Sequence, residues 1–126
     1  MQKEYIIKVD RRDMMKIIKC SGTGNIMAVL TEKENVDEKI VKANDVDAAF
    51  EKHVPQFGVK EDKVIVSVNH VMEEDHYIEW IMVDYGDKQI IKEFKPGDEP
   101  KLEVEYQDGL KAYSYCNKHS LWEAKL

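Results

Sequence analysis

Alternating apolar and polar residues dominate the second half of the chain and predict a series of short β-strands. In residues 63–70, KVIVSVNH, the side chains of Val64, Val66, Val68 and His70 would share one face of a strand. Four further strands of this kind are predicted at residues 76–85, 89–94, 101–106 and 110–116.

Turn sequences separate these predicted strands at intervals of roughly 8–12 residues, as in sandwich folds. They are Gly86-Asp87, Lys95-Pro96-Gly97-Asp98 and Asp108-Gly109. The Asp-Gly pair is the strongest short signal for a hairpin in this sequence. Strands of this length and spacing predict an all-β fold, an antiparallel β-sandwich.

The first half of the chain gives weaker signals. One short helix is predicted over residues 46–53, VDAAFEKH, with Asn44 or Asp45 as its N-cap and its end before Pro55. Three earlier segments have the apolar content of strands: residues 4–9, 14–20 and 24–32.

Composition narrows the class of protein. A chain of 126 residues suits one hydrophobic core and needs no disulfide to fold. Its net charge of −6 argues against binding to nucleic acid or to a membrane surface, because both require a basic face. No apolar run approaches the ~20 residues of a membrane span, and residues 1–13 lack the apolar core of a signal peptide. We therefore expect a cytoplasmic protein, in which the two cysteines are free thiols or metal ligands.

The histidines are the candidate chemistry. A single histidine is more often a surface or core residue than a ligand, but here the whole set lies where predicted elements end. His70 and His76 would be roughly 20 Å apart in one straight strand, at ~3.3 Å per residue. Residues 71–75 break the alternation, so a loop would bring both imidazoles to a common centre. His53 ends the predicted helix, and all these segments would meet at one rim of the sandwich.

A thiol accompanies the imidazoles, because Cys116 precedes His119 by three residues at the end of a predicted strand. Four imidazoles and one thiolate exceed the four ligands that zinc prefers. They suit a redox-active first-row metal with one position left open. Because a thiolate donates electron density to its metal, such a site is suited to binding and reducing a small dioxygen species.

Three segments carry a family resemblance: EKHVP (51–55), NHVMEEDHYIEWI (69–81) and SYCNKHSLW (114–122). They resemble the signature segments of superoxide reductases, the neelaredoxin and desulfoferrodoxin group, and the likeness runs from Val46 to Trp122. It implies an immunoglobulin-like β-sandwich and one mononuclear iron, Fe²⁺/Fe³⁺, held by the four histidines in a plane with Cys116 axial. It also implies one-electron reduction of superoxide to hydrogen peroxide without release of oxygen.

The resemblance assigns roles to two neighbours of His53. Glu51 matches a glutamate that can occupy the sixth position of the ferric iron, and Lys52 matches a lysine that supplies positive charge and helps deliver protons. An acidic protein repels superoxide at long range, so a local cation such as Lys52 is required on physical grounds too. The resemblance further implies rubredoxin as the electron donor and a homo-oligomer.

The N-terminal region departs from the family. Desulfoferrodoxins carry a rubredoxin-like iron site with four cysteines there, and residues 19–25, KCSGTGN, resemble its start. Thr23 stands where a second cysteine is expected, and one cysteine cannot hold that iron. We predict a degenerate segment over residues 1–43, an iron domain over residues 44–126, and a bystander role for Cys20. Next to ligands, Ser120 and Val71 stand where the family has Gly and Pro.

Other interpretations remain open at this point. A cupredoxin-like electron carrier would use two His, one Cys and an axial Met. A structural zinc or metal-storage module would leave no open position, and a plain interaction domain would leave the histidines without a shared role. Trp80 and Trp122 are interpreted as packing residues that also shield imidazoles. The acidic run 73–75 is interpreted as a solvated loop, with a second reading as a docking point for the electron donor.

Overall fold

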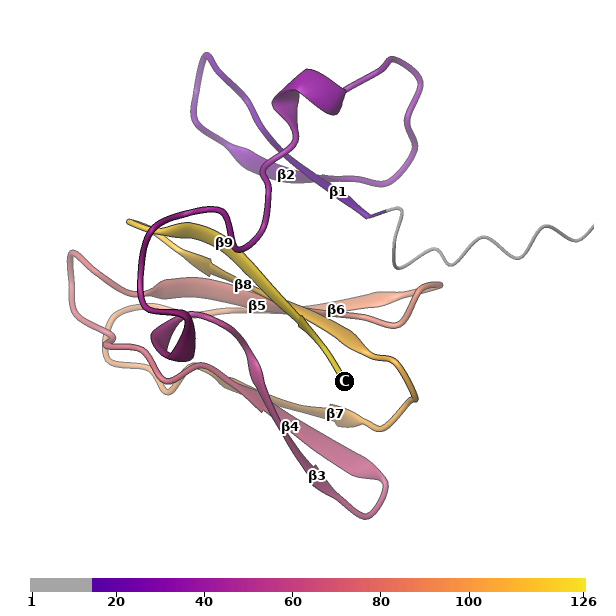
Figure 1. Cartoon of the computed structure of the whole chain (residues 1–126), viewed down its shortest axis with the longest axis vertical. Coiled ribbons are helices and arrows are strands. Elements are labelled where there is room, and N and C mark those ends of the chain that lie inside the picture. Colours follow the sequence, from indigo (N-terminus) through magenta and orange to yellow (C-terminus); the bar gives the residue numbers. More distant parts are fainter. Residues whose placement is uncertain (1–14) are drawn as a thin grey trace, which may run out of the picture.

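Three layers of β-structure make up residues 15–126, the part of the chain that this computed structural model describes (Figure 1). A hairpin formed by β1 (Lys16–Lys19) and β2 (Ile26–Val29) lies over the outer face of a four-stranded sheet. That sheet contains β5 (Ile78–Asp84), β6 (Gln89–Glu93), β8 (Lys111–Cys116) and β9 (Ser120–Lys125), in the order β6-β5-β8-β9. A three-stranded sheet in the order β3-β4-β7 forms the last layer, from β3 (Gln56–Lys60), β4 (Lys63–Ser67) and β7 (Lys101–Glu105).

The two larger sheets form the predicted all-β, immunoglobulin-like sandwich, in which every strand pair is antiparallel. All five strands predicted in the second half of the chain are confirmed, with ends shifted by at most three residues. The strands β3 and β9 were not predicted. The expected strands at residues 14–20 and 24–32 correspond to β1 and β2, and the one at residues 4–9 lies outside the described residues.

The inner faces of the sandwich bury the predicted alternating residues. Val64, Val66 and Val68 are all buried, and they pack against Ile81 and Val83 of β5. Burying an aliphatic side chain of this size contributes roughly 1.5–3 kcal/mol, so these residues fix which way β4 faces. The next position of the same alternation is His70, which therefore lies just beyond the strand at the rim of the core.

Turns connect the strands in two ways. Gly86 adopts a φ of 97° in the hairpin between β5 and β6, as predicted. The prediction of a hairpin at Asp108-Gly109 was wrong: the turn exists, but β7 and β8 belong to different sheets. The turn sequence alone could not distinguish a hairpin from a crossover between sheets.

The predicted helix over residues 46–53 is much shorter than expected. Only η3 (Phe50–Lys52), a single 3₁₀ turn, precedes His53, and a second 3₁₀ turn, η2 (Asp37–Lys39), lies after β2. Asn44 is not an N-cap, because its φ is 58° and its side chain pairs with the edge of β9. Its Oδ1 accepts from the Glu123 amide at 2.8 Å, and its Nδ2 donates to the Glu123 carbonyl at 3.2 Å. This contact fastens the chain to β9 ahead of η3.

Neither of these helical turns, which lie within residues 15–126, has the length and apolar character of a membrane span.

Replacing Asn44 by Ala should lower the free energy of unfolding by about 2 kcal/mol, because two hydrogen bonds to β9 are lost at a left-handed backbone position. Urea denaturation measures this change. Asn44→Gly is the matched control, because it accepts the backbone conformation while losing the same hydrogen bonds. Equal stability of Asn44→Ala and the native protein would contradict this role for Asn44.

Candidate metal centre

Cys116 ends β8 at the rim of the sandwich and is fully buried. Its backbone pairs with Ile78 on β5 and with Ser120 on β9, so neighbouring strands fix the thiol from both sides. Burial raises the pKa of the Cys116 thiol, because the thiolate loses its hydration. A bound cation would reverse this preference by stabilising the thiolate.

His119 lies beside the sulfur, as its spacing from Cys116 predicted. A tight turn follows β8, and Nδ1 of His119 is 3.7 Å from Sγ of Cys116. Ser120 completes the turn with a φ of 65°, in the left-handed region that glycine adopts without cost. This conformation gives the physical reason for the glycine expected at position 120.

The loop between His70 and His76 folds back on itself, as predicted. The amide of Glu73 donates to the carbonyl of His76 at 2.9 Å, and the reverse bond is 3.2 Å long. The two imidazole centroids are consequently 4.5 Å apart. Nε2 of His70 lies 3.4 Å from Sγ of Cys116, so the loop brings the first imidazole to the thiol.

His53 is buried and held by three contacts. Its Nδ1 donates to the Ala49 carbonyl at 2.7 Å, and its own carbonyl accepts from the Ser114 hydroxyl at 2.6 Å. The Trp122 ring stacks on the imidazole at 4.8 Å, and the indole N–H donates to the His119 carbonyl at 2.9 Å. Trp122 therefore packs in the core as predicted and also positions two imidazoles.

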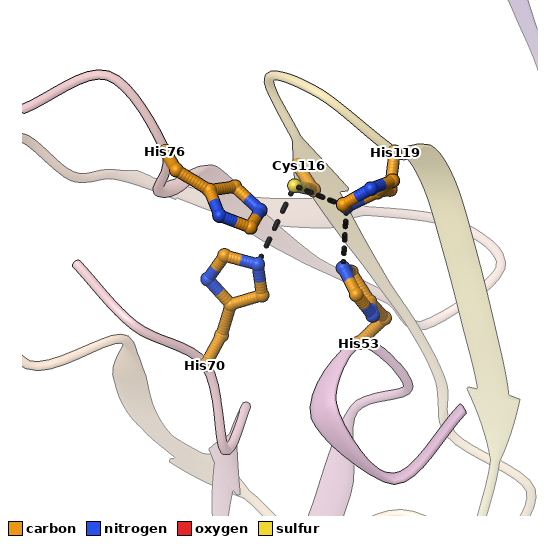
Figure 2. A group of neighbouring side chains, drawn as sticks. All are labelled: His53, His70, His76, Cys116 and His119. Carbon is orange, nitrogen blue, oxygen red and sulfur yellow. Dashed lines mark hydrogen bonds between the residues drawn. The ribbon is translucent and has the colours of Figure 1, made fainter. Parts of the chain in front are cut away.

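The four imidazoles form a closed ring, and the sulfur of Cys116 lies next to it (Figure 2). Neighbouring centroids are 4.5 to 5.1 Å apart, in the order His53, His70, His76, His119 and back to His53. The sulfur of Cys116 contacts His70 and His119, which are opposite corners of this ring. The thiol therefore belongs to the same cluster as all four imidazoles.

The donor atoms fit a metal ion. All five lie within 4.8 Å of one another, about twice a metal–ligand bond of ~2.0–2.3 Å. The Nδ1 atoms of His53 and His70 face backbone carbonyls, so their Nε2 lone pairs point into the pocket. Nε2 of His76 is buried without a hydrogen-bond partner among the described residues, and a cation would supply that partner.

Glu51 and Lys52 are exposed on η3, the turn that leads directly into His53. Burial lowers the pKa of His53, and the Glu51 carboxylate opposes this shift. Both side chains are thus open to solvent, immediately before His53 in the chain. The exposed acidic run 73–75 is also solvated, as predicted.

Two positioning residues were missed from the sequence. Asn117 joins the two ligand loops, because its side chain accepts from the Tyr77 amide and donates to the Asp75 carbonyl, each at 3.0 Å. Ser114 holds the backbone of His53. The position of Asn117 between Cys116 and His119 in the sequence could have indicated its role. The role of Ser114 depends on how β8 lies beside His53, which the sequence does not show.

Comparisons with known proteins agree on one family. The desulfoferrodoxin family model matches residues 45–125. A desulfoferrodoxin homolog of Archaeoglobus fulgidus is 38% identical, covering 89% of this chain and 98% of the relative. A desulfoferrodoxin of Syntrophotalea carbinolica is 36% identical, covering 90% of this chain and 98% of the relative.

Solved structures give the same result. The superoxide reductase of Treponema pallidum superposes with a TM-score of 0.69 at 25% identity, covering 87% of this chain and 99% of that one. The superoxide reductase of Giardia intestinalis has a TM-score of 0.51 at 29% identity, covering 60% of this chain and 97% of that one. The superposition on the Treponema pallidum protein covers more of this chain than residues 45–125, so it includes part of the N-terminal region.

The metal-free protein should lose stability as the pH falls. Burial lowers the pKa values of His53 and His70 below the ordinary value of about 6.5. Below that pH the unfolded chain binds more protons than the folded one, so the free energy of unfolding falls; above it, the full stability is present. Urea denaturation from about pH 8 to about pH 5 measures the profile. Replacing both residues by Gln should flatten it, and an unchanged slope would contradict this origin.

Proposed function

This chain belongs to the desulfoferrodoxin family, and from that premise we propose that it reduces superoxide to hydrogen peroxide at one mononuclear iron. We assign the iron to the four-histidine ring with Cys116 on its axis. The single observation that carries the proposal is this arrangement of four nitrogen donors and one sulfur donor. It leaves the side of the ring opposite the sulfur for a sixth ligand.

The arrangement disfavours the other interpretations. A cupredoxin-like site needs two histidines, one cysteine and an axial methionine, whereas here all four histidines share the pocket with the thiol. A structural zinc site closes with four ligands, so a fifth donor has no place in it. A plain interaction domain gives no reason for five donor atoms to meet.

Reduction of superoxide consumes one electron and two protons for each peroxide formed. Bound iron would supply the electron by passing from the ferrous to the ferric state. As a ligand, the Cys116 thiolate would donate electron density to the iron, which favours this electron transfer. The chain's own task is to hold the imidazoles by their carbonyl contacts, attract the anion and deliver protons.

We assign attraction of the anion and delivery of protons to Lys52. The chain has a net charge of −6, so superoxide meets a repulsive field at long range. An exposed ammonium on η3, directly before His53, would supply positive charge next to a ligand of the iron. Glu51 on the same turn is assigned as the carboxylate that occupies the sixth position of the ferric iron.

The region before the sandwich is proposed to be a degenerate segment over residues 1–43, followed by the iron domain over residues 44–126. Two backbone hydrogen bonds hold the turn between β1 and β2. The Cys20 amide donates to the Asn25 carbonyl, and the Gly24 amide donates to the Cys20 carbonyl. The Thr23 hydroxyl takes the place of a second thiol; it lowers the pKa of the Cys20 thiol and accepts from the Asn25 amide.

The remaining assignments come from the family resemblance. We infer rubredoxin as the electron donor, a homo-oligomeric assembly and a cytoplasmic location. Two free cysteines, Cys20 and Cys116, support a reducing compartment.

The reaction is tested by adding superoxide to the reduced, iron-loaded protein. Peroxide should form without matching oxygen, while the ferric product is coloured by its thiolate. Cys116→Ser should lose both the colour and the activity, because the axial donor is gone. Cys20→Ser is the matched control and should change neither. One molecule of oxygen for every two of superoxide would mean dismutation and would overturn the proposal.

The role of Lys52 is tested by Lys52→Ile, which should slow the reaction of superoxide with the reduced protein by about tenfold. Pulse radiolysis at several ionic strengths measures the rate. The salt dependence should weaken in the variant, because the local attraction is lost. Lys60→Ile, at the distant end of β3, is the matched control. Equal rates for the two variants would remove Lys52 from the mechanism.

A further inference from the structure

Each turnover of the proposed reaction oxidises the iron by one electron, so a donor must return an electron to a buried site. This inference rests on the proposed function and concerns where that electron enters. The side of the histidine ring opposite the sulfur is assigned to superoxide. An entry from the sulfur side would keep the donor and the substrate from competing.

A pair of aromatic rings leads from the sulfur side to the outer face of the four-stranded sheet. Tyr115 directly precedes Cys116 on β8, and alternation along the strand turns its ring outward as the thiol turns inward. Trp80 is its cross-strand partner on β5, and the two rings stack at 5.6 Å with an interplanar angle of 9°. Covalent bonds and one ring stack therefore join Trp80 to the thiolate.

An open groove reaches Trp80 from outside. It lies where the β1–β2 hairpin passes over β5 and β6, between Ile26 and Met27 of the hairpin and Met82, Ile91 and Glu93 of the sheet. Figure 1 shows this hairpin as a separate layer above the sheet. Met27 and Ile91 are 43% and 55% exposed, so the groove presents apolar side chains to solvent.

The size of the groove favours a protein over a small molecule. Its volume is about 150 Å³, below the ~300–1,000 Å³ of most small-molecule sites. A protruding apolar side chain fits such a hollow, and the exposed residues at its edge would extend the contact. Small, weak interfaces of this kind are typical of electron-transfer complexes.

We propose that this groove is the docking site of a small protein that carries a one-electron centre just beneath an apolar surface. The donor's centre loses one electron, which passes through the Trp80 and Tyr115 rings to the Cys116 thiolate and reduces the ferric iron to ferrous. No bond forms or breaks, and no proton is transferred. The acidic loop at residues 73–75 then has no part in docking.

The docking surface is tested with reduced rubredoxin as the probe donor. Ile91→Glu and Met27→Glu should each weaken its binding, measured by calorimetry, and slow its reduction of the ferric protein, both by about tenfold. Ile65→Glu is the matched control, because Ile65 is 43% exposed on the opposite sheet. Reduction by dithionite, which needs no docking, should stay unchanged in all three variants.

The aromatic route is tested separately by Trp80→Leu at saturating rubredoxin, where electron transfer within the complex should slow about tenfold although docking is complete. Trp80→Phe keeps a ring in the stack and should restore most of the rate. Equal rates for the two variants would overturn the route.

The docking site would be overturned if rubredoxin failed to reduce the native protein, or if both groove variants bound rubredoxin as the native protein does. It would also be overturned if Glu73→Lys lost as much binding and as much reduction rate as the groove variants. The fourth contrary result is dissociation of an oligomer in Ile91→Glu. The last would make the groove a contact between copies of the chain. Oxidation of the reduced protein by superoxide tests the proposed function alone and does not depend on the groove.

Discussion

The mutual proximity of five donor atoms is the constraint on which the other features of the site depend. Nε2 of His53 and Nδ1 of His119 are 3.0 Å apart, and Nε2 of His76 has no described partner. Lone pairs that face each other in a pocket of low polarity repel unless a proton or a cation lies between them. The strand pairing of the sheet offsets this repulsion. Because β8 lies between two strands, the thiol at its end cannot move away. The imidazoles come from loops, and each loop is fastened by backbone or side-chain hydrogen bonds.

The same constraint explains the residues around the ligands. Trp122 can stack on His53 and bond to the His119 carbonyl because it lies on β9, directly after the turn that carries His119. Asn117 joins the loop of His76 to that turn, so movement of one ligand strains the other. Ligand orientation is therefore set by neighbours that do not touch the metal, which is the usual requirement for a site with little freedom.

Sequence reasoning predicted most of the sandwich and the clustering of Cys116 with the four histidines, because both leave local signals. Alternation identified β4, and the break after His70 identified the loop. It missed β9 because the neighbours Leu121 and Trp122 are both buried: one faces the hairpin and the other the core, so the first half of the strand shows no alternation. It missed β3, an edge strand exposed at most positions. The helix over residues 46–53 was overestimated because Asn44 pairs with a strand 79 residues away, a contact that no local pattern contains.

The N-terminal hairpin covers the outer face of the four-stranded sheet. Ile17 of β1 packs there with Met82, Tyr113 and Leu121. Without that cover, the outer face of the strands that carry the thiol would meet water. The hairpin thus protects the strands that carry the histidine and cysteine cluster. The groove between the hairpin and strands β5 and β6 also leaves Trp80 reachable, on the side of the sheet from which the thiolate can be approached without crossing the histidine ring.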